Sequence, residues 1–350
     1  MSRLPFVAAL IVFMLASVPA QAPDAARVRA AFLRMIERPR VPLAPETQPR
    51  LDAGAYRAEH FTFSSEAGER VPGVFLKAAA AANNRRPAVI FLHGTGSRKE
   101  EFLALMRAFA DRGFATAAID ARHHGSRIAS KDGSNAQYFA AMLETYRTGK
   151  GRPYLYDTVW DVMRLVDYLE TRADVDPKRI GVMGISKGGT EAYLAAAVDP
   201  RIAVAVPVIG VQGFRWALDN EQWQARVSTF APPIEAAARD AGVPAIDAAF
   251  VRRFYDRVAP GIYGDYDAGP MLALAAPRPV LVINGDSDPR TPLPGVQEAV
   301  AAARSTYAGM GVEDRLGLYL QPNAAHVVTP VAELVMADWF AKWLVPLPPR

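Results

Sequence analysis

The 350-residue sequence contains no cysteine, and this absence excludes several kinds of chemistry at once. Without thiols the chain can form no disulfide, no thiolate metal site and no thiol nucleophile. The sequence also lacks a concentrated block of charge, because 40 Lys and Arg residues against 36 Asp and Glu residues give a net charge of +4 that is dispersed along the chain. Nucleic-acid binding needs clustered cations, so we expect no nucleic-acid partner.

Long apolar runs are also absent beyond the N-terminus, so we expect no stable membrane insertion of the mature protein. The apolar run at 6–18 is too short to cross a bilayer comfortably, follows one positive charge at Arg3, and precedes small residues. This pattern is typical of a secretory signal peptide. We expect residues 1–20 to be removed after Ala20, with Ala22 as the alternative cleavage site, and the protein to be periplasmic or secreted. An uncleaved N-terminal anchor is the other interpretation.

The rest of the chain divides into two parts of different character. Residues 21–53 begin with helical periodicity over 24–37, and prolines spaced between 39 and 49 then predict a stiff, extended connector. Residues 54–350 open with two β-rich stretches and continue as an alternation of apolar runs and helical patterns. This second part has the length and composition of one large domain.

The alternation predicts the fold class. Short runs rich in β-branched residues lie at 87–92, 114–119, 179–183, 202–209, 279–283 and 316–320. Helical patterns between them lie at 100–112, 157–171, 188–198 and 295–310. Strands that are apolar on both faces and separated by helices predict an α/β fold, with a mostly parallel, doubly wound sheet and helices on both faces. The active site is then expected at the carboxyl ends of the strands.

One long interval interrupts this alternation. Residues 211–275 contain no buried strand, and the interval is far longer than a usual connection of about 4 to 6 residues. Such a length predicts that the interval has structure of its own, and its aromatic residues, from Trp216 to Tyr266, are each interpreted mainly as contacts that attach it to the core. We therefore expect a helical cap insertion over the end of the sheet.

A nucleophile motif lies in the middle of the chain. Residues 179–189 form a predicted strand that runs into G-x-S-x-G and then directly into a helix. This spacing requires a turn so sharp that the backbone of the serine is strained, which is tolerable only with Gly184 and Gly188 on either side. A G-x-S-x-G alone is weak, but between a strand and a helix it indicates a serine nucleophile at Ser186.

A serine hydroxyl needs a base to accept its proton, in practice a histidine oriented by a carboxylate. Of the five histidines only His326 follows the serine, in a loop just after the last predicted strand. The loop after the preceding strand offers Asp286 and Asp288. We expect Asp288 to be the acid, because reaching the imidazole requires a residue beyond the turn, and Asp286 to cap or brace that turn.

The negative charge that forms during attack needs preorganised donors. Lys187, directly after the nucleophile, supplies one backbone N–H. The second is expected from the backbone N–H of Thr95, in the loop that leaves the first parallel strand. His93 in the same loop is interpreted as a structural residue that fixes the turn by hydrogen bonds.

These motifs resemble those of the α/β-hydrolase superfamily, particularly its dienelactone-hydrolase-like and acyl-esterase or prolyl-oligopeptidase-like branches, from about residue 61 to the C-terminus. Residues 93–94 are similar to the family's HG loop, 184–188 to its nucleophile elbow, 285–292 to its acid loop G-x-x-D-x-x-x-P, and His326 to its base. The resemblance implies an α/β-hydrolase fold and a serine hydrolase.

A further segment, 120–126, is similar to a D-x-R-x-x-G-x-S segment that is structural in this family, so we assign no catalytic role to Asp120, Arg122, His123 or His124. The sequence also departs from its relatives. The HGGG loop of one esterase group is replaced by His-Gly-Thr-Gly, the nucleophile is serine where dienelactone hydrolases use cysteine, and no propeller domain precedes the sheet.

Taken together, the residues predict a secreted serine hydrolase that cleaves a small-molecule carboxylic ester through an acyl-enzyme intermediate. Ser186, His326 and Asp288 are the expected catalytic residues. No cofactor or metal is expected, since neither H-E-x-x-H nor a P-loop occurs. A serine peptidase or amide hydrolase is the first alternative, and a catalytically silent hydrolase fold that acts as a binding protein is the second.

Overall fold

The structure is a computed structural model that describes residues 25–50, 54–79, 85–129, 134–152 and 154–345. The expected signal peptide, 1–20, and both candidate cleavage sites lie outside these residues. Within the described ranges, no helix combines the length and the hydropathy needed to cross a membrane.

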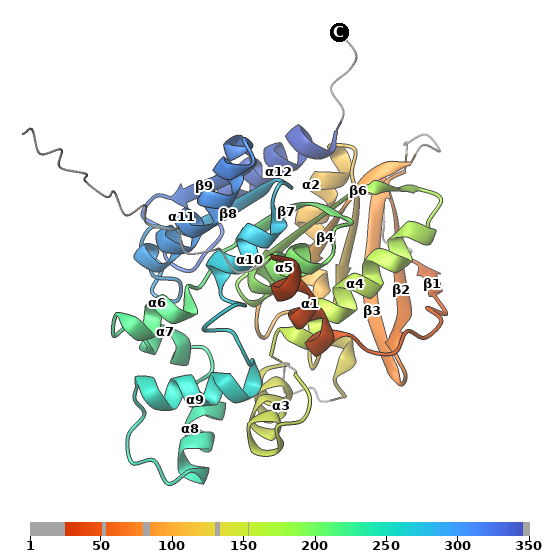
Figure 1. Ribbon diagram of the computed structural model, residues 1–350. Coiled ribbons are helices and arrows are strands. Elements are labelled where there is room, and N and C mark those ends of the chain that lie inside the picture. The colour runs from red at the N-terminus through yellow and green to blue at the C-terminus, as the bar shows by residue number, and fades with distance from the viewer. Residues whose placement is uncertain (1–24, 51–53, 80–84, 130–133, 153, 346–350) are drawn as a thin grey trace, which may run out of the picture.

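A nine-stranded sheet with the order β1-β2-β3-β5-β4-β6-β7-β8-β9 forms the centre of the molecule (Figure 1). The pairs from β5 through β4, β6, β7 and β8 to β9 are parallel, while β1, β2, β3 and β5 pair antiparallel. The mostly parallel α/β sheet predicted from the sequence is therefore confirmed. The strands are β1 (Glu46–Pro49), β2 (Tyr56–Glu66), β3 (Glu69–Ala78), β4 (Arg86–Leu92), β5 (Ala115–Ile119), β6 (Val175–Ile185), β7 (Ile202–Val208), β8 (Val280–Gly285) and β9 (Leu316–Gln321).

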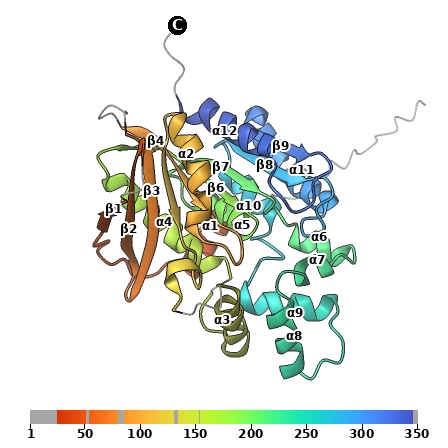
Figure 2. The same cartoon turned by 180° about the vertical axis from the view of Figure 1, so that it is seen from behind.

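Helices cover both faces of the sheet, as expected for strands that are apolar on both sides. Adjacent residues of β4 show why: Ile90 packs into the core cluster of one face, and Val89 and Phe91 pack into the cluster of the other. Figure 2 shows the second face with its helices in front. The first face carries α1 (Ala25–Ile36), α4 (Tyr156–Thr171), α5 (Lys187–Val198), α10 (Ala268–Ala275) and α11 (Leu293–Gly309), and the second carries α2 (Leu103–Asp111) and α12 (Pro330–Leu344).

The interval 211–275 folds into helices, and most of them form a cap beyond one end of the sheet (Figure 1). α8 (Ala231–Asp240) and α9 (Ala248–Val258) pack against each other and against α3 (Ser134–Thr148). α3 comes from a part of the chain for which the sequence predicts no helix. α10, at the other end of the interval, packs against α5 and α11 in the layer on the sheet. The remaining cap helices are α6 (Phe214–Asp219) and α7 (Gln224–Val227).

Part of the predicted connector is a strand. After α1 the chain has no regular secondary structure over 37–45, and β1 then pairs antiparallel with β2 at the edge of the sheet. All four residues of β1 are exposed, and the edge position accommodates Pro49, which has no N–H to donate. The connector therefore extends the sheet by one short strand.

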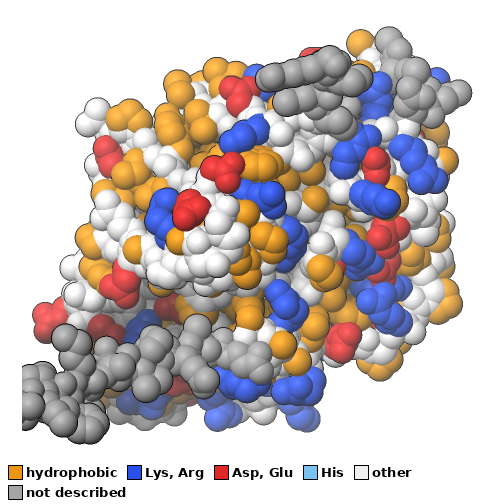
Figure 3. Space-filling model, turned by 45° about the horizontal axis from the view of Figure 1, so that its top comes forward, with side chains coloured by type: hydrophobic (Ala, Val, Ile, Leu, Met, Phe, Trp, Pro, Cys, Tyr) orange, Lys and Arg blue, Asp and Glu red, His pale blue; other side chains and the backbone are white. Residues whose placement is uncertain are grey.

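The surface charge is mixed. On the face in Figure 3, Lys and Arg side chains lie over the surface with Asp and Glu side chains among them and apolar side chains between. This distribution follows from the dispersal of the two signs along the sequence.

Candidate active site

Ser186 lies at the turn between β6 and α5, at the carboxyl end of a central strand. Its backbone has φ 56° and ψ −116°, a conformation that L-residues rarely adopt and that stores strain. A Cβ on Gly188 would lie 2.1 Å from the carbonyl oxygen of Leu92, and one on Gly184 would lie 2.0 Å from the carbonyl oxygen of Gly188. The two glycines of the motif are thus needed because the turn packs directly against backbone.

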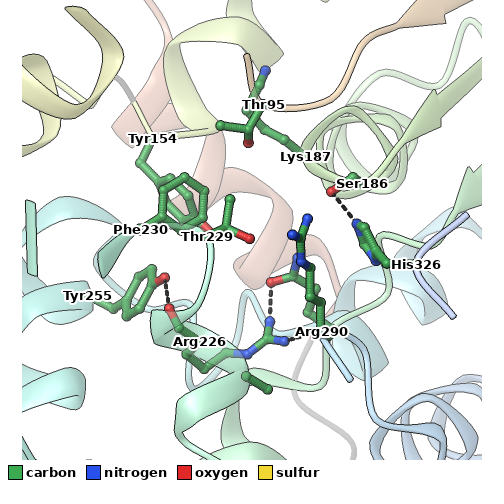
Figure 4. Close-up of a pocket in the computed structure, with 12 residues that line it drawn as sticks. Thr95, Tyr154, Ser186, Lys187, Arg226, Thr229, Phe230, Tyr255, Arg290 and His326 are labelled. Atoms are coloured by element: carbon green, nitrogen blue, oxygen red, sulfur yellow. Dashed lines mark hydrogen bonds between the residues drawn. The ribbon is translucent and has the colours of Figure 1, made fainter. Parts of the chain in front are cut away.

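The structure brings the three predicted catalytic side chains together from separate loops. His326 Nε2 lies 2.9 Å from Ser186 Oγ, as Figure 4 shows, although 140 positions separate the two residues. His326 Nδ1 lies 2.7 Å from Asp288 Oδ2. The imidazole therefore stands between the hydroxyl and a carboxylate, each within hydrogen-bond distance.

Asp288 is buried and held by its own loop. Its Oδ1 accepts hydrogen bonds from the backbone N–H groups of Arg290, at 2.8 Å, and Thr291, at 3.3 Å. The Thr291 hydroxyl lies 2.7 Å from Oδ2. Burial acts to raise the pKa of Asp288, but the hydrogen bonds from His326 and Thr291 outweigh it and keep that pKa below its usual range. The carboxylate is thus ionised and fixed in orientation.

Asp286, the alternative acid, has a different position. It lies in the same loop, but it accepts hydrogen bonds from the backbone N–H groups of Asn323, at 2.9 Å, and Ala324, at 3.3 Å. The hydrogen bond from Asn323 lowers the pKa of Asp286. Asp286 thus braces the loop that carries His326, and Asp288 is the carboxylate that contacts the imidazole.

Lys187 and Thr95 lie beside Ser186 in one pocket. Lys187 is the first residue of α5, and the bond from Thr190 N to Ser186 O, 3.1 Å, is the first of that helix. The backbone N–H of Lys187 therefore has no acceptor within the helix. Gly94, before Thr95, lies against the turn, since a Cβ there would be 3.6 Å from the Cβ of Ser186.

The Lys187 side chain lies in a buried ion pair. Its ammonium group is 2.7 Å from a carboxylate oxygen of Glu191, one turn further along α5, and both side chains are buried. Burial raises the pKa of Glu191. The sequence leaves the partner of Lys187 open, and the i, i+4 spacing is the signal that identifies it.

His93 holds the loop of Thr95 in place. Its Nε2 accepts a hydrogen bond of 3.0 Å from the backbone N–H of Ala121, so its Nδ1 carries the proton and donates to Gly94 O at 2.8 Å. Burial, together with the Lys187 cation, lowers the pKa of His93 to about 3, so this imidazole is neutral. The hydrogen bonds agree with the structural role predicted from the sequence.

The segment that follows β5 makes a polar network away from the pocket. Asp120 accepts from the Lys99 ammonium at 2.6 Å and from the backbone N–H of Ser126 at 2.8 Å. Arg122 forms two hydrogen bonds, of 3.0 and 3.1 Å, with the buried carboxylate of Asp161. Neither Asp120 nor Arg122 lines the pocket at Ser186. Among the described residues, no group of three or more acidic, histidine or cysteine side chains is placed to hold a metal ion.

The cap, the acid loop and the segment just before α4 supply pocket residues that the motifs do not reveal. The residues that line the pocket at Ser186 but do not belong to the predicted site are Tyr154, Gln212, Ala225, Arg226, Thr229, Phe230, Tyr255 and Arg290. The free volume among them is about 10 Å³, room for about one water molecule. No sequence signal marks these positions, because their place over Ser186 depends on how the cap packs.

Comparisons with known proteins relate the chain to carboxylic ester hydrolases. The sequence matches the acetyl xylan esterase family (AXE1) over residues 39–217. YtaP of Bacillus subtilis (strain 168), named as a hydrolase, is 25% identical over 289 residues, which cover 79% of this chain and 84% of YtaP. A 4-O-methyl-glucuronoyl methylesterase of Neurospora crassa is 27% identical over 211 residues, 56% of this chain and 51% of that protein.

A solved structure shares the fold. Acetyl xylan esterase 1 from Thermoanaerobacterium sp. JW/SL YS485 aligns with a TM-score of 0.64 at 17% identity, over 91% of this chain and 93% of that one. At this identity the likeness is one of fold. The match to the methylesterase covers only about half of that protein's length, whereas the matches to the other two proteins cover most of theirs.

Proposed function

Because the chain belongs to the acetyl xylan esterase (AXE1) family, we propose that it is a serine esterase that removes small acyl groups, acetyl first among them, from hydroxyl groups of carbohydrates. The observation that carries this proposal is the hydrogen-bonded line from Ser186 through His326 to Asp288.

The chemistry follows from the order of the three groups. Asp288 accepts a hydrogen bond from the Nδ1–H of His326, so Nε2 presents its lone pair to the Ser186 hydroxyl. As Ser186 Oγ attacks the ester carbonyl, its proton moves to Nε2, and the ionised Asp288 stabilises the imidazolium. The imidazolium then gives the proton to the departing alcohol. Water, deprotonated by the same imidazole, hydrolyses the acyl-enzyme and restores Ser186.

The oxyanion of each tetrahedral intermediate needs donors at the end of α5. The backbone N–H of Lys187 has no hydrogen-bond acceptor within α5, and it lies at the N-terminal, positive end of the helix dipole. We assign the second donor to the backbone N–H of Thr95. The hydrogen bonds of His93 to Gly94 and Ala121 hold the loop that contains Thr95 in place. One such donor is worth about 3 to 4 kcal/mol of barrier.

Export is part of the proposal. The apolar run at 6–18 and the small residues that follow it support a signal peptide, cleaved after Ala20 or Ala22, and a periplasmic or secreted enzyme. N-terminal sequencing of the protein isolated from its native host tests this directly. A mature protein that begins at Met1 would contradict it.

The nucleophile is tested by comparing the wild type with Ser186→Ala on 4-nitrophenyl acetate and on an acetylated xylo-oligosaccharide. We expect the variant to lose activity by a factor of about 10⁴ or more while its unfolding curve remains cooperative. Activity within tenfold of the wild type would remove the assignment. A wild type that is inactive on both esters but cleaves peptide 4-nitroanilides would favour the peptidase alternative. A folded wild type that acts on neither class would favour a binding protein.

A further inference from the structure

The pocket at Ser186 carries an excess of positive charge. Its lining residues include Lys187, Arg226 and Arg290, and none of them is Asp or Glu. The Lys187 charge is matched by Glu191 at 2.7 Å. The two arginines have no such partner, since no carboxylate in the described ranges lies within 4.0 Å of either guanidinium.

Arg226 is the more unusual of the two, because its side chain is buried, with the residue only 2% exposed. Its two terminal nitrogens donate to neutral acceptors, the side-chain oxygen of Gln212 and the carbonyl oxygen of Arg290. Its Nε is buried and has no hydrogen-bond partner among the residues that the structure describes. Its guanidinium carbon lies 5.1 Å from the centroid of the Phe214 ring, which compensates part of the charge. A buried charge without a carboxylate partner is nevertheless costly, so the guanidinium here points to a function.

The carboxylate whose pKa Arg226 affects, Asp267, is occupied elsewhere. It accepts hydrogen bonds from the backbone N–H groups of Phe214, Arg215 and Ala268, at 3.0, 2.9 and 2.7 Å. Burial raises the pKa of Asp267, and those backbone N–H groups and the Arg226 charge oppose that shift. Asp267 therefore caps α10 and leaves the guanidinium of Arg226 without an ion pair.

Arg290 is the exposed member of the pair of arginines, Arg226 and Arg290, that line the pocket. Its backbone is held on both sides, since its N–H donates to Asp288 and its carbonyl accepts from Arg226. Its side chain forms no ion pair in the part of the chain that the structure describes, and in Figure 4 its guanidinium points into the space between the labelled residues, toward Thr229. The loop that positions the acid of the proposed triad thus also aims a free guanidinium at the pocket.

We propose that Arg290, backed by the buried charge of Arg226, forms a subsite for a carboxylate on the substrate. The inference rests on the proposed esterase function and narrows it to esters whose acyl or alcohol part carries a carboxylate near the scissile bond. A planar guanidinium binds a carboxylate through two parallel hydrogen bonds, which favours this anion and fixes its orientation. Arg226 holds the backbone of Arg290 and adds its charge to the same region.

Two matched ester pairs test the subsite. For the acyl part, mono-4-nitrophenyl glutarate is compared with 4-nitrophenyl methyl glutarate, and for the alcohol part, 4-acetoxybenzoate is compared with methyl 4-acetoxybenzoate. Each pair differs in one carboxylate, and the rate without enzyme is subtracted. We expect kcat/KM for the charged member to exceed that of its neutral partner by about tenfold or more in at least one pair, the range expected of a hydrogen-bonded charge.

Three variants test whether the preference for the charged ester comes from Arg290. Arg290→Gln should bring the ratio of charged to neutral kcat/KM to within about threefold of one, and Arg290→Lys should retain part of it because the charge remains. Arg239→Gln, an exposed cap arginine that does not line the pocket, is the matched control and should keep the wild-type ratio.

The outcomes separate this inference from the function on which it rests. A ratio near one in both pairs, with hydrolysis of the neutral esters that depends on Ser186, would overturn the subsite and leave the esterase in place. A preference that survives Arg290→Gln would overturn the assignment to Arg290. A wild type that hydrolyses 4-nitrophenyl acetate but none of the four esters would overturn the subsite alone. A wild type that hydrolyses neither the four esters nor 4-nitrophenyl acetate nor the acetylated xylo-oligosaccharide would remove both proposals.

Discussion

The carboxylate of Asp286 accepts a hydrogen bond of 2.9 Å from the backbone N–H of Asn323, which fastens the loop after β8 to the loop after β9. Asn323 has φ 53°, so the chain turns sharply here, three residues before His326. A second brace comes from the buried Gln321, whose side chain bonds Val327 O at 2.9 Å and Thr329 N at 2.8 Å. The proposed base therefore stands on a loop that is tied at both ends.

The two neighbouring aspartates should respond differently to substitution. Asp288→Asn removes the carboxylate that orients His326, and we expect kcat for 4-nitrophenyl acetate to fall by a factor of about 10⁴. Asp286→Ala removes only the brace on the loop of His326, so a much smaller loss is expected, accompanied by lower stability. Steady-state kinetics and urea unfolding of both variants provide the measurement. If kcat fell further in Asp286→Ala than in Asp288→Asn, Asp286 would be the acid and Asp288 the brace.

The strained backbone of Ser186 predicts a gain in stability when the strain is removed. Glycine adopts positive φ without the steric cost of a Cβ, whereas alanine retains that cost. We therefore expect Ser186→Gly to be about 1 kcal/mol more stable than Ser186→Ala, which equally lacks the hydroxyl. The free energies of unfolding in urea give the comparison. Equal stability of the two variants would mean that the turn stores no strain.

The buried neutral His93 predicts a loss of stability in mild acid. Burial lowers the pKa of His93 to about 3 in the folded protein, while the unfolded chain accepts the proton below about 6.5. Between these values protonation favours the unfolded state, so stability is lost as the pH falls below 6.5, by about 1.4 kcal/mol per pH unit for this group. His93→Gln should make the dependence of the unfolding free energy on pH shallower by that amount between pH 6.5 and 5. An unchanged slope would argue that His93 is protonated in the folded state.

The ion cluster around Asp161 predicts a large loss of stability when its central carboxylate is removed. Burial raises the pKa of Asp161, but the guanidinium groups of Arg127 and Arg122 outweigh it and lower this pKa to about 2. Asp161→Asn leaves two largely buried cations with a weaker partner and should cost about 3 to 5 kcal/mol at pH 7.

The lowered pKa of Asp161 also makes the stability of the protein depend on pH, which an exposed carboxylate with an unshifted pKa would not do. The stabilisation from Asp161 is complete above the pKa of the unfolded chain, about 3.9, and is lost as the pH falls through 2. The gap in unfolding free energy between the wild type and Asp161→Asn should therefore narrow as the pH is lowered from 5 toward 2. A gap that stays constant would show that the ion pairs are not its source.

Much of the sheet could be predicted from sequence because its central strands are buried on both faces. Val89, Ile90 and Phe91 belong to a short apolar run rich in β-branched residues, which favours a strand that is covered on both faces. Helix α12 has no comparable signal. Its buried Met336 and Phe340 are accompanied by exposed apolar residues, among them Leu334, which blur the 3.6-residue periodicity.

The candidate site divides in the same way. Ser186, Asp288 and His326 could be predicted because each follows a strand whose carboxyl end must lie at one edge of the sheet. Arg226 and Phe230 could not, because their place over the serine depends on the packing of the cap against α3 and on aromatic contacts such as that of Phe230 with Tyr154, 5.0 Å between ring centroids. Local sequence carries no record of such distant contacts.

The most direct measurement is the pre-steady-state reaction of the wild type with an excess of 4-nitrophenyl acetate, followed by mass spectrometry of the acid-quenched protein. We expect a burst of 4-nitrophenol and an acetyl group on the peptide that contains Ser186, with neither in Ser186→Ala. Turnover of the ester with no acyl group on Ser186, or with equal acylation of the alanine variant, would contradict the proposed mechanism.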